Sequence, residues 1–222
     1  ARLLGATHSP DGADWLRETC HGHRWQVSRF LPGRYEALRR FMHPGWSWPA
    51  VQPAESQLPG NDDQLFARAT PVAWNDIAQE SREPVTGTTT WGQICRVSVE
   101  PRDGLAGYSR PFEGSPPIDL LHAVCDALID RHGPRKECLF AFWDGFGLRV
   151  NVDTERTTEL GQGAHYLMAG DLRDLSLLYQ NVKRDAFEFA NEIPQAVWPL
   201  DHSWFFTSPF YIDSTFLAGP LA

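Results

Sequence analysis

Apolar residues recur at helical spacing in several segments of the chain. The clearest segment spans 116–132, where one apolar face repeats every three or four residues. Ser115 is expected as its N-cap, Pro116 occupies its first position, and Gly133 followed by proline ends it. The apolar face consists of Ile118, Leu121, Cys125, Leu128 and Ile129. Shorter helices are predicted at 14–20, 74–81 and 171–180.

Strand-like runs alternate with these helices. Asp144-Gly145 between two apolar runs predicts a β-hairpin that pairs 139–143 with 146–152. Residues 35–42 fit both a strand and a helix face, and we interpret them as a strand. Residues 88–99 show a strand pattern around Ile94, with a helical alternative at 91–94. Further strands are predicted at 25–30, 164–169 and 203–211, the last interrupted at Pro209.

The order of these elements indicates the fold class. Strands and helices interleave without the regular spacing of doubly wound folds, so we predict an α+β fold with a mainly antiparallel sheet flanked by helices. A chain of 222 residues fits one large domain or two small ones, and we expect a single domain that spans 1–222. A domain of this size buries roughly 70% of its unfolded surface and needs no disulfide or metal to hold it together.

One long segment lacks a regular pattern. Residues 44–71 contain five prolines and two glycines, which predicts a Pro-rich loop. The same segment carries Trp46 and Trp48, whereas a merely disordered loop seldom contains tryptophan. We therefore expect part of this loop to pack on the body of the protein as a lid.

Composition narrows the classes of partner. The net charge of −8 opposes non-specific binding of nucleic acid, which depends on cationic neutralisation of phosphates. No apolar run reaches the roughly 18 residues of a membrane span, and the N-terminus has no apolar core of signal-peptide length. We therefore predict neither a nucleic-acid nor a membrane partner.

The cysteines are Cys20, Cys95, Cys125 and Cys138. They form no CxxC pair, so we expect reduced, mostly buried thiols and a cytoplasmic location.

Basic residues gather in one part of this acidic chain. Five arginines lie between residues 24 and 40, with three histidines nearby. The group could form an anion-binding face, but we favour the simpler interpretation of solvated arginines on an ordinary surface. The arginines are Arg24, Arg29, Arg34, Arg39 and Arg40.

The familiar chemical motifs are incomplete. Two glycine pairs, at 145–147 and 161–163, lack the third glycine of the dinucleotide fingerprint and its strand-to-helix order. A serine-hydrolase elbow around Ser47 fails because Pro49 stands where the second glycine belongs. Cys20, His21 and His23 are close in sequence, but no second cluster matches them in spacing. We therefore predict no cofactor and no metal.

The C-terminal region is the densest meeting of ionisable, hydroxyl and aromatic groups. Trp198 and Trp204 flank Asp201 and His202, and a strand-like run leads from there to Asp213. The region could be a structural corner, a binding site with the two indoles as an aromatic wall, or a catalytic site in which His202 moves a proton. Adjacent strand residues point to opposite faces, so Asp201 is poorly placed to orient His202. We prefer the structural interpretation and assign no catalytic residue.

Ligand or partner binding remains open for nine residues. These candidates are Trp198, Asp201, His202, Trp204, Asp213, Thr215, Trp46, Trp48 and His43.

Four stretches, taken in order, resemble a family of uncharacterised actinobacterial proteins. They are Arg29-Phe30-Leu31-Pro32 through Arg39-Arg40-Phe41-Met42-His43-Pro44, Val72-Ala73-Trp74-Asn75-Asp76-Ile77-Ala78, Cys138 to Gly147 with its Trp143-Asp144-Gly145, and Trp198-Pro199-Leu200-Asp201-His202-Ser203-Trp204 with Ile212-Asp213-Ser214-Thr215. His202 stands where the family usually has arginine, which weakens a general-base role at this position. The resemblance implies one integrated domain of unknown function, and it carries over no catalytic residue.

Together these patterns favour a binding protein over an enzyme. We expect a non-enzymatic module that binds another protein or a small ligand, of the bacterial regulatory or toxin-immunity kind, because acidic immunity proteins meet basic toxins through complementary charge. The alternative is a hydrolase or transferase that uses His202 or His43 with Asp213. The patterns do not indicate the partner's identity or the oligomeric state.

Overall fold

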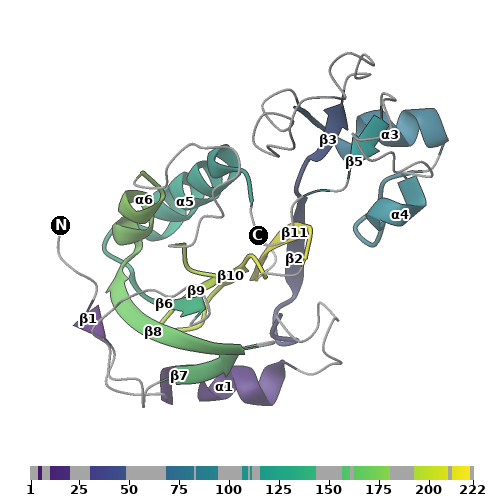
Figure 1. Ribbon diagram of the computed structural model, residues 1–222. Coiled ribbons are helices and arrows are strands. Elements are labelled where there is room, and N and C mark those ends of the chain that lie inside the picture. The colour runs from purple at the N-terminus through teal and green to yellow at the C-terminus, as the bar shows by residue number, and fades with distance from the viewer. Residues whose placement is uncertain are drawn as a thin grey trace. The chain divides into compact units, whose positions relative to one another are not determined.

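The chain divides into two compact units in a computed structural model (Figure 1). Unit 1 comprises Ala1–Phe41, Glu113–Arg184 and Phe189–Ala222, and unit 2 comprises Met42–Phe112 and Asp185–Glu188. The structure describes residues 5–6, 11–20, 31–48, 69–82, 84–94, 107–109, 111, 116–143, 157–160, 163–180, 193–209 and 212–220.

Unit 1 is built on an eight-stranded sheet. Its strands follow the order β1-β8-β6-β9-β10-β11-β2, and β7 also pairs with β8. Every pair whose register is defined is antiparallel. The strands are β1 (Gly5–Ala6), β2 (Ala37–Met42), β6 (Glu137–Trp143), β7 (Thr157–Leu160), β8 (Gly163–Asp171), β9 (Ala196–Pro199), β10 (Phe205–Thr207) and β11 (Ser214–Gly219). The predicted α+β class, with a mainly antiparallel sheet and flanking helices, is confirmed.

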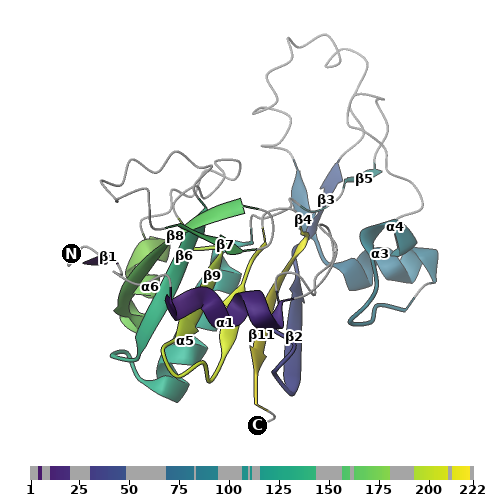
Figure 2. The ribbon, with the colours of Figure 1, turned by 90° about the horizontal axis from the view of Figure 1, so that it is seen from below.

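Three of the described helices cover the two faces of this sheet. Helices α5 (Ile118–His132) and α6 (Leu172–Gln180) lie on one face, and α1 (Asp11–Thr19) lies on the other (Figure 2). Alternation along β6 explains this arrangement, because Phe140 packs among residues of α5 and α6 whereas Leu139 and Ala141 pack among residues of α1. The strands of unit 1 therefore contribute to two hydrophobic clusters, one on each face.

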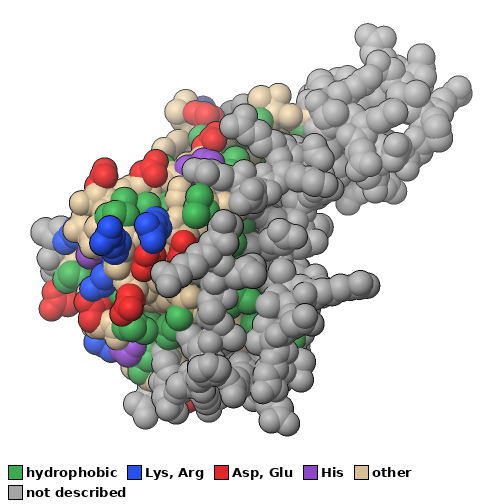
Figure 3. Space-filling model, turned by 90° about the vertical axis from the view of Figure 1, so that its left-hand side faces the viewer, with side chains coloured by type: hydrophobic (Ala, Val, Ile, Leu, Met, Phe, Trp, Pro, Cys, Tyr) green, Lys and Arg blue, Asp and Glu red, His purple; other side chains and the backbone are tan. Residues whose placement is uncertain are grey.

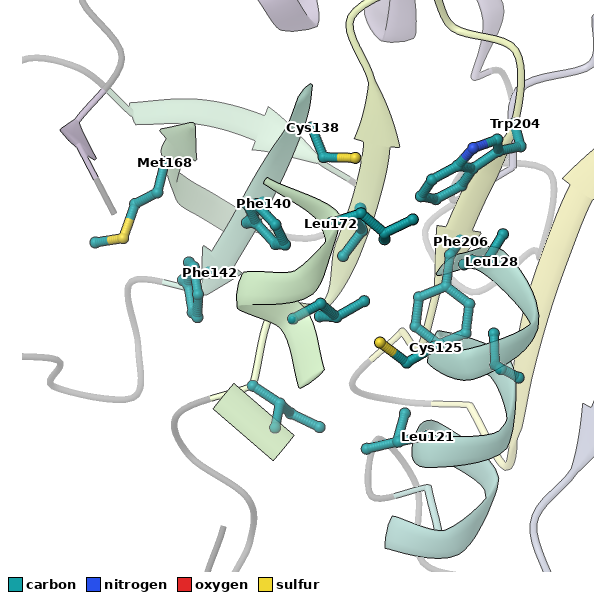
Figure 4. Packing of buried hydrophobic residues seen from close by; sticks show 14 residues of the cluster. Leu121, Cys125, Leu128, Cys138, Phe140, Phe142, Met168, Leu172, Trp204 and Phe206 are labelled. Carbon is teal, nitrogen blue, oxygen red and sulfur yellow. The ribbon is translucent and has the colours of Figure 1, made fainter. Parts of the chain in front are cut away.

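The cluster under α5 and α6 is the larger of the two. Phe140 and Phe206 are almost completely buried in it, beside Leu121 and Cys125 of α5 and Leu172 of α6 (Figure 4). Full burial of a side chain of this kind contributes about 1.5–3 kcal/mol relative to exposure. The turn that joins β9 to β10 is therefore anchored from both ends by well-packed strands.

The described part of unit 2 contains a smaller sheet and two short helices. The strand order is β4-β3-β5, and both pairs are antiparallel. Trp74 and Ile94 form its buried cluster with Ala78, and the Trp74 indole donates a hydrogen bond to the His43 carbonyl at 2.7 Å. The elements are β3 (Gly45–Trp48), β4 (Thr70–Val72), α3 (Trp74–Ser81), α4 (Trp91–Ile94) and β5 (Gly107–Ser109).

The helix predictions are largely confirmed, with shifts at the ends. The helix at 74–81 is observed as α3, and Gly133 ends α5 as expected, with its N–H bonded to the Ile129 carbonyl at 2.8 Å. Helix α5 begins at Ile118 rather than at Pro116, because a residue that precedes proline avoids helical geometry and Pro117 follows it. Helix α1 begins three residues earlier than predicted, where the fully buried Ala13 packs against the sheet.

Several strand predictions need correction. The ambiguous 35–42 is a strand, whereas 91–94 is helical, so the helical alternative was right there. The Pro-rich loop does not span all of 44–71: β3 and β4 occupy its two ends and pair with each other. Pro71 fits on β4 because that strand lies at the edge of its sheet, where no ladder N–H is needed.

Other predictions fall on residues outside the described ranges. These include the strand at 25–30 and the part of the predicted Pro-rich loop at 49–68. The predicted N-cap Ser115 is wrong, because Pro117 stands at the N-cap position of α5. The predicted hairpin of 139–143 with 146–152 is also wrong, because β8 and β9 pair with the two sides of β6. The single domain over 1–222 and the cytoplasmic location stay predictions. Among the helices that the structure describes, none has the length and apolar content needed to cross a bilayer.

Candidate functional site

The turn between β9 and β10 sends its side chains to opposite faces of the sheet. Its backbone is fixed by hydrogen bonds from the Leu200 N–H to the Glu137 carbonyl at 3.2 Å and from the His202 N–H to the Pro199 carbonyl at 2.9 Å. His202 has a φ of 53°, which places a non-glycine residue in the left-handed region. Strained backbone of this kind is found preferentially at functional sites, so the turn is a candidate site.

On the α1 face, four side chains form a structure that we call the aromatic platform: Trp15, Arg34, Tyr35 and His202. The imidazole of His202 stacks on the Trp15 indole, with ring centroids 4.3 Å apart and an angle of 23° between the planes. The Arg34 guanidinium lies over the Trp15 ring at 5.2 Å and over the Tyr35 ring at 5.8 Å. The Tyr35 hydroxyl donates to the His202 carbonyl at 3.0 Å. Each member therefore contacts at least one other member.

The platform is partly open to solvent. Arg34 is exposed, and the rings of Trp15, Tyr35 and His202 are half-buried. Burial lowers the pKa of His202 and the nearby Arg34 charge lowers it further, whereas Asp201 acts in the opposite direction. Burial also raises the pKa of Tyr35 well above its usual range. At neutral pH the platform therefore presents one fixed positive charge, on Arg34, above neutral rings.

Asp201 leaves the same turn in another direction. Its carboxylate is bound by the Lys136 ammonium and accepts a hydrogen bond from the Ser203 N–H at 3.1 Å. Partial burial acts to raise the pKa of Asp201, but the hydrogen bonds from Lys136 and Ser203 and the Lys136 charge outweigh it and hold the pKa at about 2. Asp201 therefore pairs with Lys136 and does not orient the His202 ring.

The two indoles that flank the turn do not form one aromatic wall. Trp198 is fully buried on the α1 face, where it stacks on Phe205 at 5.7 Å and meets the edge of Trp15 at 6.4 Å. Trp204 is 2% exposed and belongs to the cluster on the other face, beside Phe206 (Figure 4). The proposed wall of Trp198 and Trp204 is therefore wrong, since the sheet separates them.

Asp213 and Thr215 are engaged at the start of β11. Asp213 accepts from Arg40 at 3.3 Å and from the Ser214 hydroxyl at 3.0 Å. The Thr215 hydroxyl, fully buried, donates to Ser208 at 3.1 Å. Because Asp213 pairs with an arginine and the His202 ring stacks on Trp15, the geometry does not join His202 and Asp213 in a proton relay.

The remaining candidates belong to unit 2. His43 is 1% exposed, and its carbonyl accepts the hydrogen bond from Trp74. Trp46 is half-buried on β3, where it pairs with Pro71 of β4. Trp48 lies at the end of the same strand, opposite Gly107. These residues do not belong to the aromatic platform, whose four members all lie in unit 1.

The described thiols are poor nucleophiles. Burial raises the pKa of Cys20 to about 11, and it raises the pKa of Cys125 and Cys138 to about 12. All three are unpaired and protonated at neutral pH. In the part of the chain that the structure describes, no three His, Cys, Asp or Glu side chains are grouped to hold a metal ion.

Sequence reasoning missed three members of the platform and one buried polar pair. Trp15 was visible only as an apolar helix residue, and Arg34 only as one of five clustered arginines. His165 and Gln195 are both buried, and the His165 Nε2 atom lies 3.2 Å from the Gln195 Oε1 atom. A single histidine within an apolar strand carries no sequence signal of such a partner. This pair links β8 to the residue before β9.

Comparison with known proteins adds no relative. The chain matches no protein-family model, no curated protein and no solved structure. The resemblance to the actinobacterial family therefore stays a prediction.

Proposed function

We propose that the protein is a non-enzymatic module that binds another protein through the aromatic platform. The observation that carries this proposal is the stack itself: His202 lies on Trp15 at 4.3 Å, and Arg34 lies over the same indole at 5.2 Å. Tryptophan, tyrosine and arginine are the residue types that contribute most to binding energy at protein interfaces. Here all three meet on one partly exposed surface.

The platform is held in place before any partner arrives. The Tyr35 hydroxyl fixes the carbonyl of His202, and the left-handed backbone at His202 directs its ring onto Trp15. The Trp15 ring in turn packs against the ring of Trp198, which is fully buried. Rigid rings lose little entropy on binding, so a preordered surface of this kind favours affinity.

The turn that carries His202 also carries an exposed leucine. Leu200 is 53% exposed, two residues before His202. A small ligand on the rings would leave this leucine in water, whereas a protein surface can cover both. The net charge of −8 favours a partner of net positive charge, as expected for a regulatory or immunity-like protein.

Capture with matched variants tests the proposal. Tagged wild-type protein is incubated with a lysate of the native host, and bound proteins are identified by mass. Leu200→Ala and His202→Asn should each lose the partner that the wild type captures. Asparagine tolerates the left-handed backbone, so His202→Asn removes the ring with little strain. Leu177→Ala, at a 46% exposed leucine on α6, is the control and should retain the partner.

The face to the left in Figure 1 mixes acidic, basic and apolar side chains without a continuous field of one sign among its described residues (Figure 3). If Leu200→Ala and His202→Asn capture the same protein as the wild type, or if Leu177→Ala alone loses it, the platform is not the contact surface.

A further inference from the structure

Arg34 contacts two aromatic rings and has no hydrogen-bond acceptor among the described residues. Among the described residues its contacts are the Trp15 ring at 5.2 Å and the Tyr35 ring at 5.8 Å, with no carboxylate partner. A guanidinium carries five N–H donors in a planar fork that matches a carboxylate. The exposed Arg34 therefore offers these donors to a group from outside the chain.

The other arginines with known partners differ from Arg34. Arg40 donates to Ser214 at 2.8 Å and to Asp213 at 3.3 Å, and Arg173 pairs with Asp171 at 2.9 Å. Both are already satisfied within unit 1. Stacking restricts the Arg34 side chain in advance, so pairing costs it less entropy than it would cost a free arginine.

The charges around Arg34 favour an anion at this point. Asp201, the acidic residue of the neighbouring turn, is already bound by Lys136. Glu36 is exposed two residues away and is the remaining acidic side chain in the segment 31–42. A carboxylate that reaches the platform can therefore contact the Arg34 guanidinium. Within the segment 31–42, Glu36 is the one acidic side chain that would repel this carboxylate.

We infer that Arg34 binds a carboxylate on the partner protein, so that the platform recognises an acidic side chain on a surface that is otherwise basic. This inference rests on the proposed function. The two charge requirements act over different distances. The net charge of −8 attracts a basic partner before contact, and this attraction is screened beyond about 8 Å at physiological ionic strength. The contact of guanidinium with carboxylate acts at hydrogen-bond distance, where such screening is weak.

Two peptides test the inference directly. One has a central glutamate between pairs of lysines, and the other has glutamine in its place, with both ends blocked. Both are titrated into ¹⁵N-labelled protein in 0.15 M salt while the Arg34 Nε–H resonance is followed. The glutamate peptide should shift this resonance and bind about fivefold more tightly than the glutamine peptide. Arg34→Gln should abolish the difference.

Arg39→Gln is the control for positive charge alone. Arg39 is exposed on β2 and has no ring contact among the described residues, so its removal should leave the fivefold preference intact. Equal binding of the two peptides, or a preference that survives Arg34→Gln, would overturn the inference. If Arg34→Gln has no effect while Leu200→Ala and His202→Asn still lose the captured partner, the inference fails and the proposed function stands.

Discussion

At the scale of single residues, Asp201 and Lys136 hold the outer side of the turn. Their ion pair is partly exposed, with the Asp201 side chain 52% accessible, so solvent screening limits what it contributes. The same carboxylate also accepts from the Ser203 N–H and so fixes the turn that presents His202. The pair therefore matters more for the shape of the turn than for overall stability.

The pKa of Asp201 sets the pH range over which this pair acts. The folded-state pKa of about 2 lies below the ordinary value of 3.8, so the stabilisation is fully present above about pH 4. It is lost as the pH falls towards 2. Asp201→Asn should lower the free energy of unfolding by roughly 0.5–1 kcal/mol at pH 6, and urea denaturation should show the difference shrink below pH 4 and vanish as the pH falls through about 2. A difference that stays constant over this range would contradict the charge-based explanation.

Gly45 is a second position where one residue decides a local structure. A Cβ atom at this position would come within 2.1 Å of the Trp91 ring. Gly45→Ala should therefore destabilise unit 2 by about 1–3 kcal/mol, measured by hydrogen exchange of the amides of α3. Gly92→Ala is the matched control because no atom lies within 4 Å of its Cβ position. If both variants behave alike, the contact with Trp91 is not what requires glycine.

His202 shows why only part of the site could be predicted from the sequence. Strand alternation predicted that the side chains of Asp201 and His202 point in different directions, and they do. The cause is different, however, because both residues lie in a turn after β9 and His202 has left-handed backbone. Histidine is enriched among non-glycine residues with positive φ, but such residues remain uncommon, so the residue type alone does not predict this backbone. The partners of its ring and its carbonyl, Trp15 and Tyr35, are 187 and 167 positions earlier in the chain. Contacts of this range lie beyond what spacing and propensity can predict.

At the scale of elements, Arg40 connects β2, the last strand in the order of the large sheet, to its neighbour β11. Its side chain joins β2 to Ser214 and Asp213 at the start of β11. Ser214 is fully buried, and the Arg40 side chain is 14% exposed, so water replaces this contact poorly. We therefore expect the pairing of β2 to depend on it.

Adjacent arginines on β2 provide the test of this tie. Arg40→Gln should lower the free energy of unfolding by about 1–2 kcal/mol and should speed hydrogen exchange along Ala37–Met42. Arg39→Gln, on the same strand but exposed, should change it by less than about 0.5 kcal/mol. Thermal unfolding followed by circular dichroism compares the two. Equal effects would mean that the loss of charge, and not the contact with β11, is responsible.

Elements with strong local signals were predicted best. The apolar face and glycine stop of α5, and the helix at 74–81, follow from local spacing. Strands β9 and β11 were missed. Pro199 and the hydroxyl residues Ser214-Thr215 give no strand pattern, yet β9 lies between β6 and β10 and is completely buried. Burial by neighbouring strands overrides local preference in such segments.

At the scale of the whole molecule, the described core clusters of the two compact units differ in size. The described cluster of unit 2 has three buried residues, Trp74, Ala78 and Ile94, whereas the two clusters of unit 1 have fourteen and eleven. Regions with fewer buried apolar groups open more readily. Native-state hydrogen exchange should give α3 an opening free energy roughly 2 kcal/mol or more below that of α5. Equal values would show that the chain opens as one cooperative unit.

The central claim is that a partner protein binds unit 1 at the aromatic platform. Hydrogen exchange with and without the captured partner tests it most directly. Exchange should slow at residues 31–36 and at the turn 200–204, and it should stay unchanged in α6, Leu172–Gln180. Protection confined to α6 or to unit 2, or no protection at 200–204, would contradict the claim.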